Sequence, residues 1–599
     1  MFSNTSQTIS DLSEALKKLK EDLHLGVTSH AAFVSAQTFR DVKRLGTKRY
    51  HVSFMPDANP WALGFAVEIE ALKRLEPAKM DAGGRPTCLP GTRVDILNNL
   101  FDSLTDPSIP SGRNIIWLRA PAGSGKSTIL NTVARHFSEM ARLGAFLFWN
   151  RNDPLNGDPL RVIRTLAFQL ADLHPGFAEK LAAQIERSPS IITSALDAQF
   201  HHLLKEPLAK LAAEADVGPI VIVLDALDEC GTAGTREGLL HTLSGGLAKL
   251  PSMFRLLVAS RDEPDIRAAL SSLNVDVHDT PIDDKSISDV DLLFKHRLAG
   301  DARAFALRHL PSNWPSESEI QRLVTLSGGL FIWASTTIRF IESGFPEDRL
   351  AKVLNASTRS PSHDPLDDLY RIALTHPFGP YDESEFKVVH SILGTIVVAR
   401  EQLADVQLSR LLGLKIRDVQ EVLSRLQPLL RGGHGRPVQV LHTSFTDFLC
   451  DLERCQDPRL HINPSAHHLD LASGCLQVMQ RDLKFNICGI ETSYKRNKDI
   501  EGIQERVDRT ITPILMYACH YWADHLESGS VPASGSHTLV DAVTDFFNHR
   551  FLYWIEVFSV KDRMSTTSVI LRKAGDWTRV RRLPHVYWQW WADFTYIES

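Results

Sequence analysis

Three short runs of mostly apolar residues interrupt the mixed polar pattern of the first half of the chain. They occupy residues 115–119, 220–225 and 254–260, and the second run is rich in β-branched side chains. A run of this length without alternation is typical of a strand that is buried on both faces, as in a parallel sheet. A helical pattern follows the first run, from Ile129 to Met140. The pattern therefore predicts an α/β core in which a parallel sheet is flanked by helices.

A loop of small residues joins the first run to this helix. From Ala120 to Thr128 it matches the phosphate-binding pattern G-x-x-x-x-G-K-[ST], except that Ala120 stands in place of the first glycine. Small residues allow backbone N–H groups to turn inward around phosphate oxygens, and the following helix points its positive end at them. Lys126 would reach the outer phosphates, and the Ser127 hydroxyl would bind Mg²⁺. The residues expected to contact nucleotide here are Pro121, Ala122, Gly123, Ser124, Gly125, Lys126, Ser127 and Thr128.

Acidic and basic side chains follow the second and third runs. Asp225 ends the second run, and Asp228 and Glu229 come directly after it. Open α/β sheets place their ligands at the carboxyl ends of strands, so Asp225 is expected to hold Mg²⁺ with Ser127. Asp228 or Glu229 would polarise an attacking water, and the planar guanidinium of Arg261, after the third run, suits a γ-phosphate. The alternatives are an ordinary acidic strand end and a solvated surface arginine.

The order of these motifs resembles that of the NACHT-type NTPases of fungi, also described as nephrocystin-3-like N-terminal domains. These proteins fall within the STAND class of signalling ATPases, which are related to intracellular immune receptors of animals and plants. The motifs that carry the resemblance are Gly91-Thr92-Arg93, the loop at 120–128, Phe148-Trp149-Asn150-Arg151, and residues 165–170, 224–230 and 259–261. Through its first motif, the resemblance adds Arg93 to the nucleotide-binding residues. It implies a nucleotide-dependent switch that is closed with ADP and open with ATP.

The same resemblance assigns two features of the later part of the chain. The helical domain of the family has a Gly-Leu-Pro-Leu turn that packs near the nucleotide base, and here Phe331 stands in place of the proline. The winged helix of the family folds back on the NTPase domain and touches the ADP β-phosphate with a histidine, which His442 matches. The alternative for His442 is a histidine packed at a domain seam. A winged helix can also read DNA, but the candidate recognition helix, 416–430, has no basic excess.

Pattern and composition divide the chain into five predicted segments. They are an N-terminal helical segment and linker (1–84), the NACHT P-loop NTPase domain (85–284), a helical domain (285–365), a winged-helix-like domain (366–460) and a C-terminal helical region (461–599). The first contains a helical pattern at 9–23, and the last ends in an aromatic cluster at 587–591 and is expected to be truncated before sensor repeats. The predicted fold class is an α/β P-loop NTPase core followed by all-α helical and winged-helix domains.

Composition indicates which partners and which cellular location are to be expected. The chain has 599 residues and a formal net charge of −6, which argues against a strongly basic nucleic-acid binder. Its seven cysteines lack paired metal-ligand spacing, so reduced thiols are expected. No apolar run approaches the roughly 18 residues of a membrane span, and no signal peptide is recognisable. The sequence therefore predicts a cytoplasmic protein without a transmembrane segment.

These expectations combine into one hypothesis with two rivals. The chain would bind ATP or ADP (GTP is also possible) with Mg²⁺ and hydrolyse ATP slowly, with Asp228, Glu229 and Arg261 at the reaction centre. The nucleotide would control conformation and self-assembly in intracellular signalling or defence, through protein partners and a ligand-induced homo-oligomer. One rival is a scaffold that holds nucleotide and never turns it over. The other is a nucleic-acid translocase, which the near-neutral charge disfavours.

Overall fold

The computed structural model describes most of the chain between residues 70 and 580. The described residues are 70–78, 80, 85–106, 108, 113–149, 157–214, 219–246, 250–251, 253–271, 273, 275–300, 304, 307–311, 313–356, 364–376, 383–492, 494–529 and 537–580. The predicted helix at 9–23 and the aromatic cluster at 587–591 lie outside them. The chain forms two compact units: the first runs to Lys295 and includes Gly328–Ile332, and the second contains His296–Ser327 and the residues from Trp333 onward. The five predicted segment boundaries stay a prediction.

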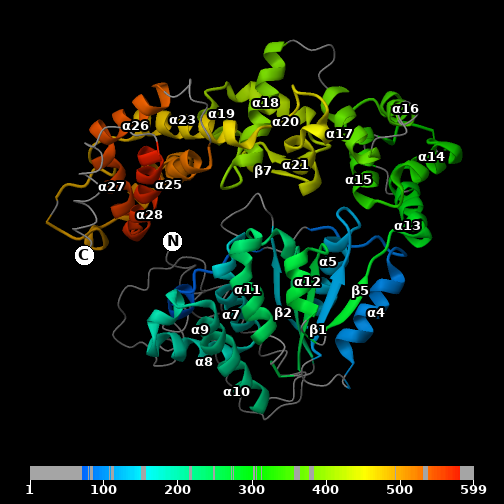
Figure 1. Ribbon diagram of the computed structural model, residues 1–599, viewed down its shortest axis with the longest axis horizontal. Coiled ribbons are helices and arrows are strands. Elements are labelled where there is room, and N and C mark those ends of the chain that lie inside the picture. The colour runs from blue at the N-terminus through cyan, green and yellow to red at the C-terminus, as the bar shows by residue number, and fades with distance from the viewer. Residues whose placement is uncertain are drawn as a thin grey trace, which may run out of the picture. The chain divides into compact units, whose positions relative to one another are not determined.

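A five-stranded parallel sheet lies at the centre of the described part of the first unit (Figure 1). Its strand order is β2-β3-β4-β1-β5. The strands are β1 (Ile115–Arg119), β2 (Leu143–Phe148), β3 (Ile220–Asp225), β4 (Phe254–Ser260) and β5 (Asp276–Asp279). Strands β1, β3 and β4 coincide with the three apolar runs. Strands β2 and β5, at the two edges of the sheet, were not predicted. In β5 the residues alternate between half-buried and exposed, so no apolar run marks it.

Helices cover both faces of this sheet. Ile116 and Leu118 of β1 pack with helices α4 (Val94–Thr105) and α5 (Lys126–Glu139), whereas Trp117 points to the opposite face. That face is covered by α7 (Val162–Leu173), α8 (Pro175–Arg187), α11 (Ala233–Gly246) and α12 (Pro264–Ser271). Because both faces are buried, the inner strands are apolar at nearly every position. The predicted α/β core, a parallel sheet flanked by helices, is confirmed.

The described part of the first unit also contains three further α-helices and several short helical turns. They are η1 (Pro159–Arg161), η2 (Pro189–Thr193), α9 (Leu196–Gln199), the π-helix η3 (Phe200–Lys205), α10 (Glu206–Glu214), η4 (Leu227–Glu229) and α13 (Asp284–Phe294). A second π-helix, η6 (Lys295–Ala299), begins at the last residue of the unit's main segment.

The described part of the second unit is helical apart from one antiparallel hairpin, β6 (Leu430–Gly433) and β7 (Arg436–Val440). Before the hairpin come α14 (Glu317–Ser327), α15 (Phe331–Glu342), α16 (Pro346–Ala356), α17 (Pro365–Thr375), α18 (Glu383–Val398), α19 (Asp405–Leu412) and α20 (Ile416–Arg425). The first two residues of α15 belong to the first unit. The helix expected to reach residue 430 ends at Arg425, because the chain must turn before β6 begins.

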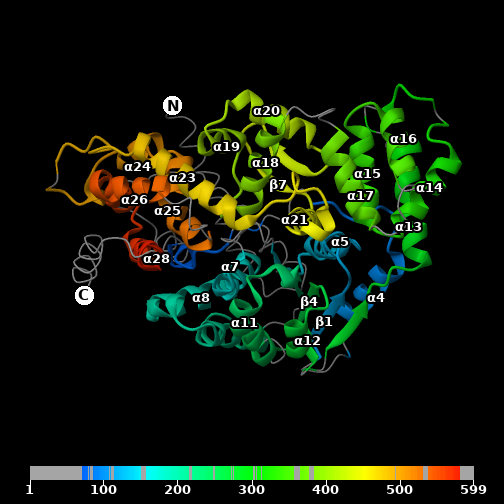
Figure 2. The same ribbon diagram turned by 45° about the horizontal axis from the view of Figure 1, so that its top comes forward.

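Further helices follow the hairpin. They are α21 (Thr443–Cys450), α22 (Leu452–Cys455), α23 (Pro464–Asp482), α24 (Ile503–Thr510), α25 (Pro513–Ser528), α26 (His537–His549), α27 (Phe551–Val560) and α28 (Thr567–Val580), with short turns at η9 (Asn497–Asp499) and η10 (Met564–Thr566). Helix α25 packs against both α23 and α28 (Figure 2). The predicted helical C-terminal region is therefore confirmed over its described residues.

Among the described helices, none combines the length and the apolar character needed to cross a membrane.

Candidate functional site

The loop between β1 and α5 is held in shape by a backbone hydrogen bond to β4 and by the conformations of two glycines. The Ala120 N–H donates to the Ser260 carbonyl at 3.3 Å, which ties the start of the loop to the end of β4. Gly123 and Gly125 have φ angles of 76° and 93°, in the left-handed region that favours glycine. Gly125 is also the N-cap of α5, so the free N–H groups of that helix lie at this end of the loop. The loop thus gathers backbone donors at the positive end of a helix.

The other predicted loop residues support this shape. Ser124 is buried, and its Oγ donates to the Pro121 carbonyl at 2.9 Å. The Thr128 N–H donates to the Gly125 carbonyl at 3.0 Å, which closes the first turn of the helix. Ala122 is half-buried. All the residues that the phosphate-binding pattern predicted therefore lie on one continuous loop and helix start.

Lys126 begins α5, and its ammonium group lies over the loop. Its Nζ donates to the carbonyls of Ala120 and Pro121, both at 2.8 Å. Burial lowers the pKa of Lys126, and the carboxylate of Asp228 is the strongest of the nearby charges that act to raise it. The predicted phosphate-binding lysine is therefore close to the acids at the carboxyl ends of the strands.

Ser127 and Asp225 meet although 98 positions separate them. The Ser127 Oγ donates to Asp225 Oδ1 at 3.1 Å. Burial raises the pKa of Asp225, while Arg85, whose Nη1 lies 3.5 Å from Asp225 Oδ2, acts to lower it. A hydroxyl and a carboxylate are oxygen ligands of the kind that Mg²⁺ prefers. The structure thus brings together the two residues that were predicted to hold the metal.

Asp228 and Arg261 form a second pair at this edge of the sheet. The Arg261 backbone N–H donates to Asp228 Oδ1 at 3.1 Å, and its Nε lies 3.3 Å from Asp228 Oδ2. The Asp228 side chain is only 2% exposed, so the pair compensates an otherwise buried charge. Ala226, with φ of 60°, turns the chain into the short helix η4, where Glu229 follows Asp228 and is half-buried. The three predicted catalytic residues thus follow neighbouring strands, β3 and β4.

Arg93 contacts the loop from the beginning of α4. Its Nη2 donates to the Ser124 carbonyl at 2.8 Å, and its Nη1 donates to Ser286 Oγ at 3.0 Å. Its backbone N–H donates to Asp289 Oδ2 at 3.1 Å, and its guanidinium lies 4.7 Å from the centroid of the Phe331 ring. Burial lowers the pKa of this guanidinium. Arg93 therefore fastens the loop to α13, and its contact with nucleotide stays a prediction.

The turn at 328–332, which the family resemblance placed near the nucleotide base, packs on the loop, and its contact with Gly123 was not predicted. The Ile332 N–H donates to the Gly123 carbonyl at 3.1 Å. A Cβ atom on Gly123 would lie 2.2 Å from Ile332 Cγ2, so the close approach requires glycine. The available signal was the glycine pair Gly328-Gly329, which begins the turn with φ angles of 53° and 78°. A glycine pair is compatible with a turn, but it does not identify the residue on which the turn packs.

Arg85 is the second residue that sequence interpretation missed. Besides its ion pair with Asp225, its guanidinium lies 3.4 Å from the centroid of the Phe148 ring. Its backbone carbonyl accepts from Asn131 Nδ2 at 2.8 Å, which attaches this residue to α5. No signal in a segment rich in glycine and proline distinguished Arg85. Arg151, at the end of the motif that begins with Phe148, lies outside the described residues.

His442 belongs to the second unit, where it caps helix α21. Its Nδ1 accepts from the Ser444 N–H at 3.1 Å and lies 2.7 Å from Ser444 Oγ. The same hydroxyl lies 2.7 Å from the Tyr370 hydroxyl. His442 thus has a local structural role, and its contact with a β-phosphate stays a prediction.

The donors present at the first unit's sheet edge suit a magnesium nucleotide. The loop N–H groups and Lys126 offer positive charge to phosphate oxygens. Ser127 and Asp225 offer oxygen atoms to the cation at the same place. Sheet, loop and acidic strand end together define the class, an α/β fold of the P-loop NTPase type.

Comparison with known proteins supports this class for the part of the chain that contains the loop and strands β1 to β4. Residues 92–261 match the family model described as Nephrocystin 3, N-terminal. No curated protein matches the chain. Among solved structures, a chain of the "Structure of Drosophila ORC bound to poly(dA/dT) DNA and Cdc6 (conformation 1)" is similar at 13% identity over 84% of each chain, with a TM-score of 0.24. A TM-score of 0.24 does not indicate a shared fold. The assignment to the P-loop NTPase class therefore depends on the geometry of the sheet and loop and on the family match.

Proposed function

We propose that the first unit binds ATP or ADP with Mg²⁺, and that the bound nucleotide sets the conformation of the chain as a molecular switch. The observation that supports this best is the approach of Ser127 to Asp225, at 3.1 Å, beside a loop whose lysine and helix start face the same edge. The family match over residues 92–261 supports the same proposal. In this role the chain would act in signalling or defence, through protein partners and self-assembly.

A switch needs a difference in nucleotide affinity between its two states. Moving a population from 1:99 to 99:1 takes about 5.5 kcal/mol. A hydrogen bond to a charged group contributes about 1.5–3 kcal/mol, so two or three contacts that form in only one state are sufficient. Arg261 toward a γ-phosphate and His442 toward a β-phosphate are the candidates.

Slow hydrolysis would reset the switch. When bound, Mg²⁺ would neutralise charge on the phosphates. Lys126 would hold the outer phosphate oxygens, and Glu229 would accept a proton from the attacking water. Asp228 would keep Arg261 in place through the two contacts that join them.

The Lys126→Ala variant of the full chain tests the proposal. Removing the ammonium group should weaken the binding of both ATP and ADP by roughly 10- to 150-fold, the equivalent of one charged hydrogen bond. The measurement is equilibrium binding of a fluorescent ATP or ADP analogue in the presence of Mg²⁺.

Arg135→Ala is the matched control. Arg135 lies on the same helix, but its side chain is 67% exposed and pairs with Glu139. This variant should bind nucleotide like the parent. If Lys126→Ala also binds like the parent while remaining folded, the loop is not a nucleotide site and the proposal fails.

A further inference from the structure

The chain between α9 and α10 folds as a π-helix, η3, rather than continuing as an α-helix. Its buried face consists of Phe200, Leu203 and Leu204, which belong to the core on one side of the sheet. His201 and His202 lie on its outer side and are 48% and 39% exposed. The core contacts therefore fix the backbone that presents both imidazoles. Single-turn π-helices are rare and occur frequently at functional sites.

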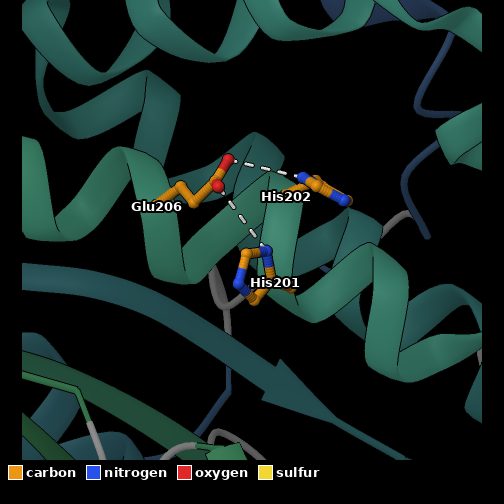
Figure 3. A group of neighbouring side chains, drawn as sticks. All are labelled: His201, His202 and Glu206. Carbon is orange, nitrogen blue, oxygen red and sulfur yellow. Dashed lines mark hydrogen bonds and ion pairs between the residues drawn. The ribbon is translucent and has the colours of Figure 1, made fainter.

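The π geometry brings residues five positions apart onto one face. In an α-helix such residues are separated by about 140° around the axis, whereas i→i+5 bonding places position i+5 close to position i. Accordingly His201, five positions before Glu206, has its Nδ1 3.7 Å from Glu206 Oε1. His202, four positions before Glu206, has its Nδ1 3.3 Å from Glu206 Oε2 (Figure 3). One carboxylate at the start of α10 thus faces two imidazoles.

These separations suit a metal ion. Zn²⁺ bound tetrahedrally by nitrogen and oxygen at about 2.0–2.1 Å places its ligand atoms about 3.4 Å apart. The two distances from histidine nitrogen to carboxylate oxygen, 3.7 and 3.3 Å, lie close to this value, and the ligand atoms of all three residues lie within 4.8 Å of one another. Rotation of half-exposed side chains can close the remaining gap. Within the described part of the chain, this is the one His, Cys, Asp and Glu group of at least three members with such geometry.

We propose that His201, His202 and Glu206 bind one divalent transition-metal ion, with Zn²⁺ as the best match. Two imidazoles and one carboxylate suit zinc and its neighbours, whereas Mg²⁺ and Ca²⁺ prefer oxygen ligands. Three protein ligands leave one position of a tetrahedral ion for water. The ion would join the π-helix to the first turn of α10. This site uses none of the residues of the loop at 120–127 and is independent of the proposed nucleotide function.

The test is a titration of the metal-stripped full chain with Zn²⁺ alone, in competition with a chromophoric chelator under reducing conditions. Even the loss of an outer-shell partner weakens metal sites by about 10- to 100-fold, so the loss of a direct ligand should cost at least as much. His201→Ala, His202→Ala and Glu206→Gln should each weaken one Zn²⁺ site by tenfold or more. Hydrogen exchange across residues 200–210 should slow with Zn²⁺ in the parent and remain unchanged in these variants.

His549→Ala is the matched control, because His549 pairs with Asp545 at 2.9 Å on α26 and is also exposed, without a second histidine beside it. It should keep the affinity of the parent and the slowing of exchange at 200–210. If the double variant His201→Ala/His202→Ala binds Zn²⁺ with the stoichiometry and affinity of the parent, the proposal is overturned. Unchanged exchange at 200–210 in the zinc-loaded parent, or binding only at millimolar Zn²⁺, would overturn it equally.

Discussion

At the scale of single residues, the neighbouring acids Asp228 and Glu229 differ in surroundings. Asp228 is buried, and both of its carboxylate oxygens are engaged by Arg261. Glu229 is half-buried at the end of the short helix η4. A general base must reach a water molecule, and a carboxylate already held by a guanidinium is less available for that role. The surroundings therefore fit Asp228 as a residue that positions Arg261, and the role of Glu229 as the base stays a proposal.

Replacing Glu229 tests whether turnover occurs at all. Glu229→Gln keeps the size of the side chain but removes its basicity, so single-turnover ATP hydrolysis should slow by about 10²–10⁴-fold. Nucleotide affinity should stay close to that of the parent. Rapid-quench measurement of ADP formation, with enzyme in excess over ATP, gives the rate.

Glu139→Gln serves as the control for charge removal, since Glu139 is exposed at the end of α5 and pairs with Arg135. Its hydrolysis rate should equal that of the parent. Equal rates in parent and Glu229→Gln would instead support the rival hypothesis of a scaffold that holds nucleotide without turnover.

At the scale of elements, the packing of α23 against α25 encloses a chain of polar side chains. His468 Nδ1 and His525 Nδ1 are 2.8 Å apart, and the Tyr517 hydroxyl lies 2.9 Å from His525 Nε2. The Arg400 N–H donates to that hydroxyl at 3.1 Å, which leaves the tyrosine proton for His525. In the consistent assignment, His525 then donates to His468, and both imidazoles are neutral. Burial lowers the pKa of His468 to about 4 and lowers that of His525 well below its ordinary value.

This histidine pair should make the second unit less stable in acid. In the unfolded chain both imidazoles take up protons near pH 6.5, whereas in the folded chain they resist protonation. The unfolded state therefore binds more protons as the pH falls below about 6.5, and stability decreases until His468 is protonated near pH 4. Urea unfolding monitored between about pH 7.5 and 4 should show this loss.

Replacing each histidine with glutamine, which has no titratable group, tests whether this pair causes the loss of stability in acid. His468→Gln and His525→Gln should reduce the dependence of stability on pH in this range, even where they lower stability at neutral pH. His549→Gln, an exposed histidine on α26, should leave the pH dependence as it is in the parent. Equal slopes in all variants would mean that other groups cause the acid sensitivity.

At the scale of the whole molecule, the chain consists of two compact units. The proposed nucleotide residues of the loop and of β3 belong to the first, and the buried histidines belong to the second. Anything that binds the folded state stabilises the part of the molecule that holds it. Chains of several domains need not unfold in one step, so each unit can be followed separately.

Bound nucleotide should therefore stabilise the first unit. At a free concentration 100 times Kd, Mg²⁺ and ADP should add about 2.7 kcal/mol to the free energy of unfolding of that unit. Hydrogen exchange resolved by peptide should slow across β1, β3 and β4. The Lys126→Ala variant should lose this gain at the same ADP concentration, and the absence of protection in the parent would contradict the proposed site.

The sequence alone was sufficient for those parts of the fold that local pattern encodes. Strands β1, β3 and β4 are buried on both faces, so each is visible as a run of mostly apolar residues. The loop at 120–127 combines glycines, a lysine and a hydroxyl at fixed spacing, because phosphate binding needs all of them in one turn. The half-exposed edge strand β5 has no such run and was missed for that reason.

Contacts between distant parts of the chain were decided only by the tertiary structure. Arg85 on Asp225, Arg93 on Ser124, and Ile332 on Gly123 depend on the strand order and on the path of the chain between elements. No periodicity within a segment specifies such a partner.

The candidate sites also depend partly on local sequence patterns and partly on contacts that form only in the folded chain. The sequence by itself predicted a phosphate-binding loop and an acidic strand end, since each is visible as a short local pattern. The tertiary structure decided that Ser127 reaches Asp225, and that Asp228 is held by Arg261. It also decided that a π-helix brings His201 to Glu206 beside His202, because an ordinary helix would place only His202, four positions before Glu206, on the same face as that carboxylate.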